Sequence, residues 1–329
     1  MKTIFIGLDI SKIWLDYSLV EDKQADPTPA KRIQNDVKDI MRLVKKLSKK
    51  YETDRLWFCF EHTGNYGLLL SSILQSNNIK YSAVPALQIK QSIGITRGKT
   101  DQIDAQRIAQ YASTFEHKLK ASELPSNELL QVKNLLSYRS QLVKIKTQLQ
   151  NSQKSYQAVQ KVVNMEFIND DLTSKIEQLQ SDIKRLDNKI KSIIQESNKL
   201  KNNYNLISSV KGVGQVLSAI ILVYTNNFKS FDDPRKFNCF TGLAPFEHSS
   251  GLSSKPSKTS PLRHRYLKSL IFNGANSAAQ YDPQLKKYYE RKREEGKAHL
   301  TVINAIGCKL IYRVFATVKR QSPYVILNH

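Results

Sequence analysis

The stretch Thr3-Ile4-Phe5-Ile6-Gly7-Leu8-Asp9 lies close to the start of the chain and joins β-branched and apolar residues to a carboxylate. A short, continuous apolar run of this kind predicts a buried β-strand. Residues 13–20 predict a second strand, near enough to form a hairpin with the first, and a short third strand is expected near 31–34. Two further apolar runs, 55–60 and 79–84, predict two more strands.

Segments with helical patterning separate these strands. Asn35 is expected to cap a helix over 36–50, whose apolar residues fall on one face. A second helix carries Leu68 to Ile73, and a third covers 86–93. A hairpin followed by alternating helices and strands predicts a mixed α/β sheet, which we assign to residues 1–120.

Four carboxylates in this region are candidates for one metal site. In the stretch GKTDQIDAQRIA, residues 98–109, Thr100 is expected to cap a helix with Asp101 and Asp104 on one face of its first turn. Asp9 and Glu61 end two apolar strands, where a carboxylate rarely lies without a partner. Oxygen ligands alone suit Mg²⁺ or Mn²⁺. An ordinary capped helix with acidic first-turn residues is the alternative for the helical pair.

The charge and cysteine content of the chain indicate what kind of partner it binds and in which compartment it works. The chain has 329 residues and a net charge of +22, from 51 Lys and Arg against 29 Asp and Glu. This imbalance points to a polyanion, above all nucleic acid, although a ribosomal-type or membrane-surface protein would share it. Cys59, Cys239 and Cys308 are scattered, without the spacing of a zinc site or a disulfide framework, which fits the cytoplasm. We expect neither a signal peptide nor a membrane span.

Residues 121–203 change character. Apolar residues recur there at alternating spacings of three and four, in two runs separated by an irregular patch at 164–170. The first run includes Tyr138, Leu142 and Ile145, and the second extends from Leu172 to Ile193. This rhythm predicts a coiled-coil helical hairpin that pairs within one chain or between chains. We interpret it as an oligomerisation arm, with a plain helical linker as the alternative.

The remaining segment, 204–329, predicts a mostly helical, basic domain. Residues 201–329 contain 20 Lys and Arg against 7 Asp and Glu. The turn around Lys211, Gly212 and Gly214, with apolar residues on both sides, resembles a helix-hairpin-helix, whose backbone N–H groups hold a phosphate. A plain connection between two helices is the alternative. Arg263 and Arg265 are further candidates for phosphate contacts.

Three further features of this segment have a structural and a functional interpretation. Residues 249–260 are rich in Ser, Lys and Thr, so that they predict either a plain surface loop or a mobile loop that carries a serine nucleophile. His248 and His264 are candidate proton carriers, although a structural role explains each as well. Residues 286–297 form a charge-rich helix, either a solvated face or a contact to a nucleic-acid backbone.

Several of these pieces, in this order, resemble one family. They are IGLDISK at 6–12, FEHTG at 60–64, KTDQIDA at 99–105, VKGVG at 210–214, FTGLAP at 240–245 and Ser250-Gly251. The chain resembles the DEDD insertion-sequence transposases, whose N-terminal domain is RuvC-like, with an RNase H-like sheet, and whose C-terminal domain carries a catalytic serine. Members of the group are guided by a structured bridge RNA.

The resemblance implies the site and its partners. Asp9, Glu61, Asp101 and Asp104 would bind Mg²⁺, and Ser250 would attack a DNA phosphate to form a covalent phosphoserine link, with Ser249 as its competitor. The carboxylates would come from one protomer and the serine from another, in a dimer or tetramer. The expected partners are donor DNA, target DNA and the bridge RNA, and we add Lys99 and Lys258 to the expected nucleic-acid contacts.

One departure and two other functions stay open. The run from Ser257 to Arg263 lacks the glycine that the family usually has there and contains a proline, which affects the loop geometry. A RuvC-like nuclease or junction resolvase would need only the four carboxylates and water. A non-catalytic coiled-coil protein that binds nucleic acid would need neither the carboxylates nor the serine.

Overall fold

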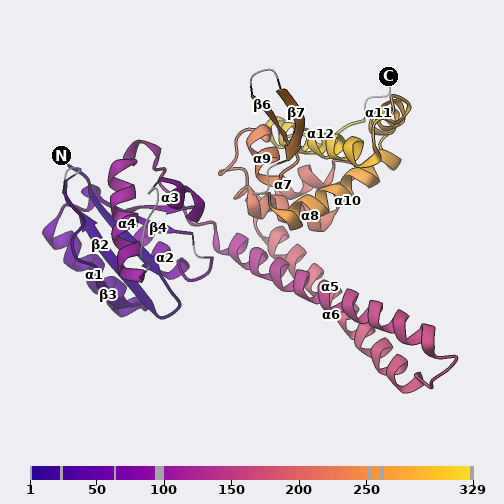
Figure 1. Ribbon diagram of the computed structural model, residues 1–329, viewed down its shortest axis with the longest axis horizontal. Helices are drawn as coiled ribbons and strands as arrows, with labels where there is room; N and C mark the ends of the chain where they lie inside the picture. The colour runs from indigo at the N-terminus through magenta and orange to yellow at the C-terminus, as the bar shows by residue number, and fades with distance from the viewer. Residues whose placement is uncertain are drawn as a thin grey trace. The chain divides into compact units, whose positions relative to one another are not determined.

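The computed structural model describes residues 2–22, 25–62, 64–92, 100–250, 253–259 and 263–326, with the backbone alone considered for 246–250 and 253–259. The chain forms two compact units, Met1–Leu124 and Pro125–His329 (Figure 1). The boundaries expected at 120/121 and 203/204 stay predictions.

The first unit is built on a five-stranded mixed sheet in the order β3-β2-β1-β4-β5. The strands are β1 (Ile4–Ile10), β2 (Trp14–Val20), β3 (Lys31–Gln34), β4 (Leu56–Glu61) and β5 (Lys80–Val84). β1, β2 and β3 pair antiparallel, whereas β4 runs parallel to β1 and β5 parallel to β4. The five apolar runs of the sequence therefore become the five strands of one sheet, and the predicted RNase H-like mixed α/β class is confirmed.

Successive side chains of β1 and β4 point to opposite faces of the sheet and belong to two separate hydrophobic cores. On one face, Ile4, Ile6 and Leu8 pack with the helices α1 (Val37–Lys50) and α2 (Leu68–Ser76). On the other face, Phe5 and Cys59 pack with α3 (Ala86–Ser92) and α4 (Asp101–Thr114). Because side chains of a strand alternate between faces, Asp9 and Glu61 share the α4 face with Phe5 and Cys59.

Gly7 lets α4 lie directly on β1. A Cβ atom at this position would overlap the backbone nitrogen of Ala109 and the carbonyl oxygen of Ala105. Small residues on the helix face complete the close approach, since Ala105, Ala109 and Ala112 are all buried. The contact fixes the height at which the first turn of α4 lies over the sheet.

The caps of two helices test the predictions about helix starts. Thr100 caps α4, because its side chain accepts a hydrogen bond from the backbone N–H of Ile103 at 3.3 Å, as expected. Asn35 was the wrong cap for α1. Asp36 accepts from the N–H of Asp39 at 2.8 Å, while the Asn35 amide donates to the carbonyl oxygen of Ser11. A carboxylate at this end also complements the helix dipole.

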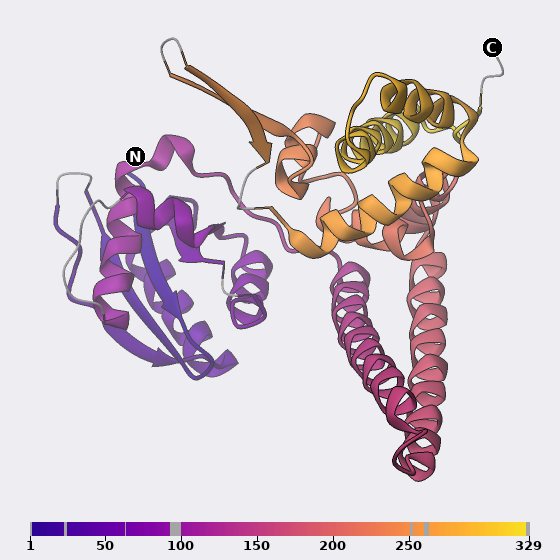
Figure 2. The same cartoon turned by 45° about the vertical axis from the view of Figure 1, so that its right-hand side comes forward.

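In the second unit, α5 (Asn127–Val159) and α6 (Glu166–Glu196) pack along each other within one chain as a long helical hairpin (Figure 2). Leu142, Leu172 and Ile183 are buried along it, and Arg139 pairs with Asp187. Tyr138 and Ile145, expected in the seam, are instead exposed. One partner helix covers only one side of α5, so the other side stays open.

The base of the hairpin joins the core of the C-terminal helices. Leu129 and Val132 of α5 and Ile194 of α6 share this core with residues of all the main C-terminal helices. Those helices are α7 (Asn198–Ser208), α8 (Gln215–Tyr224), α9 (Pro234–Thr241), α10 (Arg265–Tyr281), α11 (Pro283–Glu294) and α12 (His299–Arg320). Hairpin and C-terminal helices therefore form one packed unit.

A two-stranded antiparallel ribbon, β6 (Pro245–Ser250) and β7 (Ser253–Thr259), projects from these helices (Figure 2). The expectation of a loop over 249–260 was therefore wrong for most of the segment. The backbone of β7 pairs with that of β6, although its residues are polar. Cross-strand pairing thus overrides the composition, which had suggested a loop.

One helix, α12, is long and apolar enough to cross a membrane by length and composition alone. Ten of its residues are buried among the C-terminal helices, including Ile306, Leu310 and Val314. The core helix of a folded domain has this same pattern. α12 thus gives only weak support to a membrane span.

Candidate active site

Two of the four candidate carboxylates lie at adjacent strand ends. β1 and β4 run parallel, with Leu8 opposite Phe60, so that Asp9 and Glu61 end neighbouring strands at the same edge of the sheet. Both side chains are half-buried and belong to the face that α4 covers. The carboxyl ends of parallel strands are a common place for ligand sites.

The first turn of α4 brings the other two carboxylates to this edge. Burial raises the pKa of the Asp9 carboxyl to about 6, with further contributions from the negative charges of Asp101, Asp104 and Glu61. The other three predicted carboxylates thus act on Asp9 electrostatically. Like charges held together in this way need a cation nearby if all are to stay ionised.

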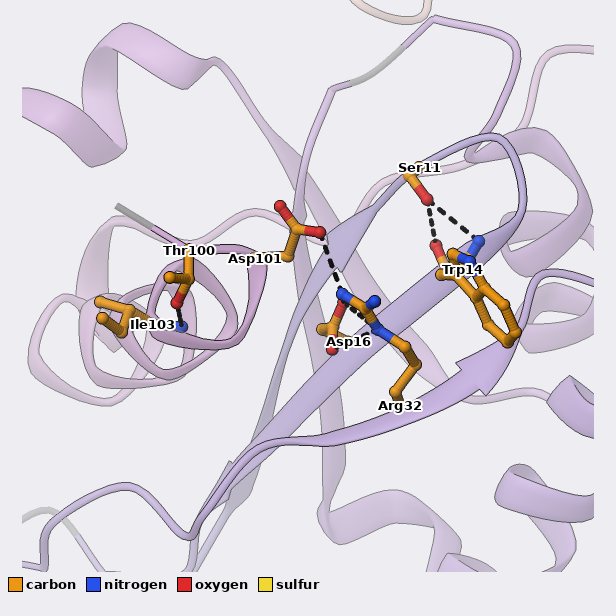
Figure 3. A network of polar contacts seen from close by, with 7 residues as sticks. All are labelled: Ser11, Trp14, Asp16, Arg32, Thr100, Asp101 and Ile103. Carbon is orange, nitrogen blue, oxygen red and sulfur yellow. Dashed lines mark hydrogen bonds and ion pairs between the residues drawn. The ribbon is translucent and has the colours of Figure 1, made fainter. Parts of the chain in front are cut away.

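A fifth carboxylate, Asp16, and an arginine complete the polar network, and neither was predicted from the sequence. Asp16 is opposite Asp9 in the register of β1 and β2, and opposite Arg32 in that of β2 and β3. The Arg32 guanidinium donates to both oxygens of Asp16 and, at 3.0 Å, to Asp101 (Figure 3). The carboxylate of Asp16 within an apolar strand was the signal in the sequence, because a buried charge requires a partner.

Both acidic residues in the first turn of α4 form ion pairs with arginines. Asp104 accepts a hydrogen bond from Arg107, one turn further along the helix, at 3.1 Å. Asp101 faces Arg32 from the opposite side of the network. In the described part of the chain, no three His, Cys, Asp or Glu side chains lie close enough together to hold one metal ion.

The donor set nevertheless fits a hard divalent cation. Its four side chains offer only carboxylate oxygens, which Mg²⁺ and Mn²⁺ prefer. The raised pKa of Asp9 reflects, in part, repulsion from Glu61, Asp101 and Asp104 that a bound cation would relieve. The fit requires Asp101 to exchange its contact with Arg32 for the metal.

Both candidate nucleophiles are in the ribbon. Ser249 and Ser250 end β6, where their backbones pair with Ser254 and Ser253 of β7. Pro245, the first residue of β6, follows directly on the turn after α9. The backbones of both serines therefore lie on a paired strand.

The glycine turn between α7 and α8 packs tightly. Gly212 has a φ of +90°, and a Cβ there would lie 2.5 Å from the carbonyl oxygen of Gly274 in α10. Lys211 and Gly214 are exposed, and no side chain caps α8 after Gly214. The turn leaves the first backbone N–H groups of α8 without a side-chain cap, as a phosphate site would require.

The other expected nucleic-acid contacts are spread over the chain. Arg263 is half-buried against Gly242, and Arg265 is exposed at the start of α10. Lys258 belongs to β7, while Lys99 lies outside the described residues. His264 caps α10 by accepting from the N–H of Leu267 at 3.1 Å, and burial lowers its pKa, which supports the structural interpretation of this histidine.

Comparison with known proteins agrees with this architecture. Residues 6–157 match the family model for IS110 DEDD transposases, and residues 204–290 match the model for transposases of the IS116/IS110/IS902 family. The pilin gene-inverting protein of Moraxella bovis is 25% identical over 98% of both chains. An uncharacterised 43.6 kDa protein of insertion element IS110 from Streptomyces coelicolor is 29% identical over 36% of this chain and 29% of its own length.

Among solved structures, T. thermophilus RuvC in complex with a Holliday junction substrate covers 36% of this chain and 99% of RuvC, at 12% identity and a TM-score of 0.29. The two family models together match most of the chain, from β1 through nearly all of α5 and again from α7 into α11. The chain belongs to the IS110 family of DEDD transposases, enzymes that recombine DNA.

Proposed function

We propose that this transposase cuts and rejoins DNA through a serine nucleophile, with its four carboxylates holding Mg²⁺ or Mn²⁺. The observation that carries the proposal is the electrostatic coupling of Asp9 to Glu61, Asp101 and Asp104 at one sheet edge. A purely structural site would gain nothing from gathering four like charges. When bound, the metal polarises the scissile phosphate and neutralises the carboxylates.

Ser250 is the proposed nucleophile, and Ser249 its competitor. The serine oxygen forms a bond to phosphorus, and the bond from phosphorus to a deoxyribose oxygen breaks. The serine gives up its proton, and the leaving oxygen takes one up. Because a serine hydroxyl is weakly nucleophilic, positioning and neutralisation of charge carry most of the rate enhancement.

The proposed partners are donor and target DNA together with a guide RNA. The net charge of +22 supplies the attraction to polyanions. Lys211, Gly214 and Arg265, all exposed, are proposed to contact phosphates without reading sequence. Base pairing with the RNA would then choose the target. Such a reaction belongs in the cytoplasm, where bacterial DNA is accessible.

An oligomer is proposed because the hairpin offers an apolar face beyond its internal seam. Tyr138, Ile145 and Val159 are exposed on α5 at a heptad-like spacing. A helix of a second copy would cover them. Such an arm would bring the carboxylates of one protomer to the serine of another, in a dimer or tetramer.

The test is a denaturing gel of the full protein with Mg²⁺, the RNA of its element and a labelled DNA junction. Wild type is compared with Ser250→Ala, Ser249→Ala and Asp101→Ala. Ser253→Ala serves as the matched control, since it lies opposite Ser250 in the ribbon. We expect a protein–DNA adduct that disappears in Ser250→Ala and Asp101→Ala and persists in the control.

Two other outcomes separate the alternatives. Cleaved DNA without an adduct, unaffected by either serine variant, would replace the serine mechanism with a water-using nuclease. DNA binding without any cleavage, unchanged by Asp101→Ala, would indicate a non-catalytic protein. Omission of the RNA tests guidance separately, because an unguided enzyme would act on the junction equally well without it.

A further inference from the structure

The C-terminal unit contains a groove that the proposed active site does not use. It has a volume of about 980 Å³ and lies between α10 and α12. Lys268 and Phe272 line it from α10, and Lys309, Tyr312 and Arg313 from α12. Pro245, the first residue of β6, is part of its wall. We call this the α12 groove.

A smaller hollow of about 380 Å³ continues from it along α11. Lys309 and Arg313 belong to both, and Lys287 and Arg291 of α11 add two more cations. No carboxylate is among the described residues that line either part. Two carboxylates outside the lining pair with these cations: Asp282, which is fully buried, accepts from Arg313 at 2.7 Å, and Glu295 lies 3.8 Å from Arg291.

Aromatic rings alternate with these cations. Lys309 Nζ lies 4.6 Å from the centroid of the Tyr288 ring, and Lys268 Nζ lies 5.7 Å from that of Phe272. Tyr312 is 43% exposed. Tyr288 and Phe272 therefore already lie against lysines, and Tyr312 is the exposed ring among the described residues that line the groove.

We infer that the α12 groove binds an unpaired segment of nucleic acid, with phosphates on its lysines and arginines and a base on the exposed ring of Tyr312. Alternating cations and aromatic faces are the common chemistry of single-strand sites. In a duplex the base faces are stacked inside, out of reach of rings recessed in a groove. An acidic peptide would satisfy the charges and leave the rings without a stacking partner.

The groove lies next to the strand that carries the proposed nucleophile. Pro245 is five residues before Ser250 on the same strand, a distance of about 17 Å along an extended backbone. A strand held in the groove would thus be anchored close to the base of the serine ribbon. The inference does not depend on Ser250 being the nucleophile, because it rests on the groove residues alone.

The test measures binding of fluorescein-labelled 12-nucleotide RNA, DNA of the same sequence and the matching DNA duplex to the full protein. Tyr312→Ala removes the exposed ring, Tyr312→Phe keeps it, and Tyr281→Ala removes another exposed tyrosine as the control. We expect Tyr312→Ala to weaken single-strand binding about tenfold. Tyr312→Phe, Tyr281→Ala and all duplex affinities should stay as in wild type.

A second measurement locates the strand. Oligonucleotides carrying 4-thiouracil are cross-linked by light, and the attached peptides are identified by mass spectrometry. Cross-links to α10 or α12 support the site. If the protein prefers RNA, the groove is assigned to a guide strand. If it prefers DNA, the groove is assigned to an unpaired DNA strand. Equal affinity means that the groove accepts both kinds of strand.

Two outcomes would overturn the inference. One is equal loss of affinity in Tyr312→Ala and Tyr281→Ala, with cross-links confined to other segments. The other is that the groove binds an acidic peptide tightly and binds no nucleic-acid strand. Adduct formation by Tyr312→Ala is measured in parallel, so failure of the groove is distinguished from failure of the serine mechanism.

Discussion

Arg32 and Asp16 form a bidentate ion pair across β2 and β3, in which the guanidinium donates three hydrogen bonds of 2.8–3.1 Å. Asp16 is only 2% exposed, so its charge depends on this partner. Since Asp9 is opposite Asp16 on β1, the pair lies at the margin of the proposed metal site. The same guanidinium reaches Asp101, and therefore links the sheet to the start of α4.

Arg32→Met should destabilise the protein by about 2 kcal/mol, because it leaves a buried carboxylate without its partner. The figure is below that of a fully buried pair, since Arg32 itself is partly exposed. Urea unfolding measures the change. Arg42→Met, which breaks an exposed pair with Asp39, should cost less than about 0.5 kcal/mol. Equal losses of stability in Arg32→Met and Arg42→Met would contradict the role of Asp16 burial.

Replacing both members, in Asp16→Leu/Arg32→Met, should restore stability and tighten Mn²⁺ binding about fivefold. Without Arg32, Asp101 loses the cation that competes with the metal. Electron paramagnetic resonance of free Mn²⁺ gives the affinity directly, independently of DNA cleavage. Unchanged or weaker binding would show instead that Arg32 prepares Asp101 for the metal.

The raised pKa of Asp9 predicts how stability depends on pH in metal-free protein. Its folded pKa of about 6 exceeds the ordinary value of 3.8, so the folded state binds the proton more tightly. Stability should therefore fall as the pH rises from about 4 to about 6. Asp9→Asn should flatten this part of the profile and raise Tm at pH 7. Thermal unfolding in EDTA tests both, and a lower Tm of Asp9→Asn at pH 7 would be the contrary result.

Gly7→Ala should lower stability by about 2–3 kcal/mol, because the added methyl group would push α4 off the sheet. It should also weaken Mn²⁺ binding, since Asp101 and Asp104 move with the helix. Gly214→Ala meets no atom within 4 Å and should change stability by less than about 1 kcal/mol. Denaturant unfolding and the Mn²⁺ titration report the two effects. A stable Gly7→Ala protein with intact metal affinity would refute the tight contact.

Tyr138→Glu/Ile145→Glu should reduce the mass of the assembly without lowering Tm. Both residues are exposed in the single chain, so the charges meet no internal partner, but they would disrupt a helix pairing between copies. Light scattering coupled to gel filtration measures the mass. Gln141→Glu, which adds a charge at a neighbouring exposed position, is the control. If the assembly keeps its mass, the outer face of α5 is not the interface.

Local sequence patterns predicted most of the sheet. Apolar runs such as 55–60 identify buried strands because side chains on both faces are covered, and Thr100 identifies a helix start through its own hydroxyl. The choice between Asn35 and Asp36 was wrong because adjacent residues compete for the same cap, and only the backbone conformation decides between them. Asp9 and Glu61 were predictable as a pair, since both end apolar strands.

Arg32 was not predictable in the same way. Its partner Asp16 is 16 residues away and its second partner Asp101 is 69 away, so the network depends on strand register and on the packing of α4. The hairpin shows the same limit, because Tyr138 follows the apolar rhythm and still lies outside the seam. Periodicity identifies an apolar stripe, whereas the number of partner helices decides which residues it buries.

The hairpin has 33 residues in α5 and 31 in α6, and only its base joins the C-terminal core. Insertion of seven residues into each helix would preserve the internal seam and lengthen the arm by about 10 Å. The core, the sheet and the serine ribbon would keep their packing. The reach of such a hairpin can therefore change in steps of whole heptads without rebuilding the core at its base.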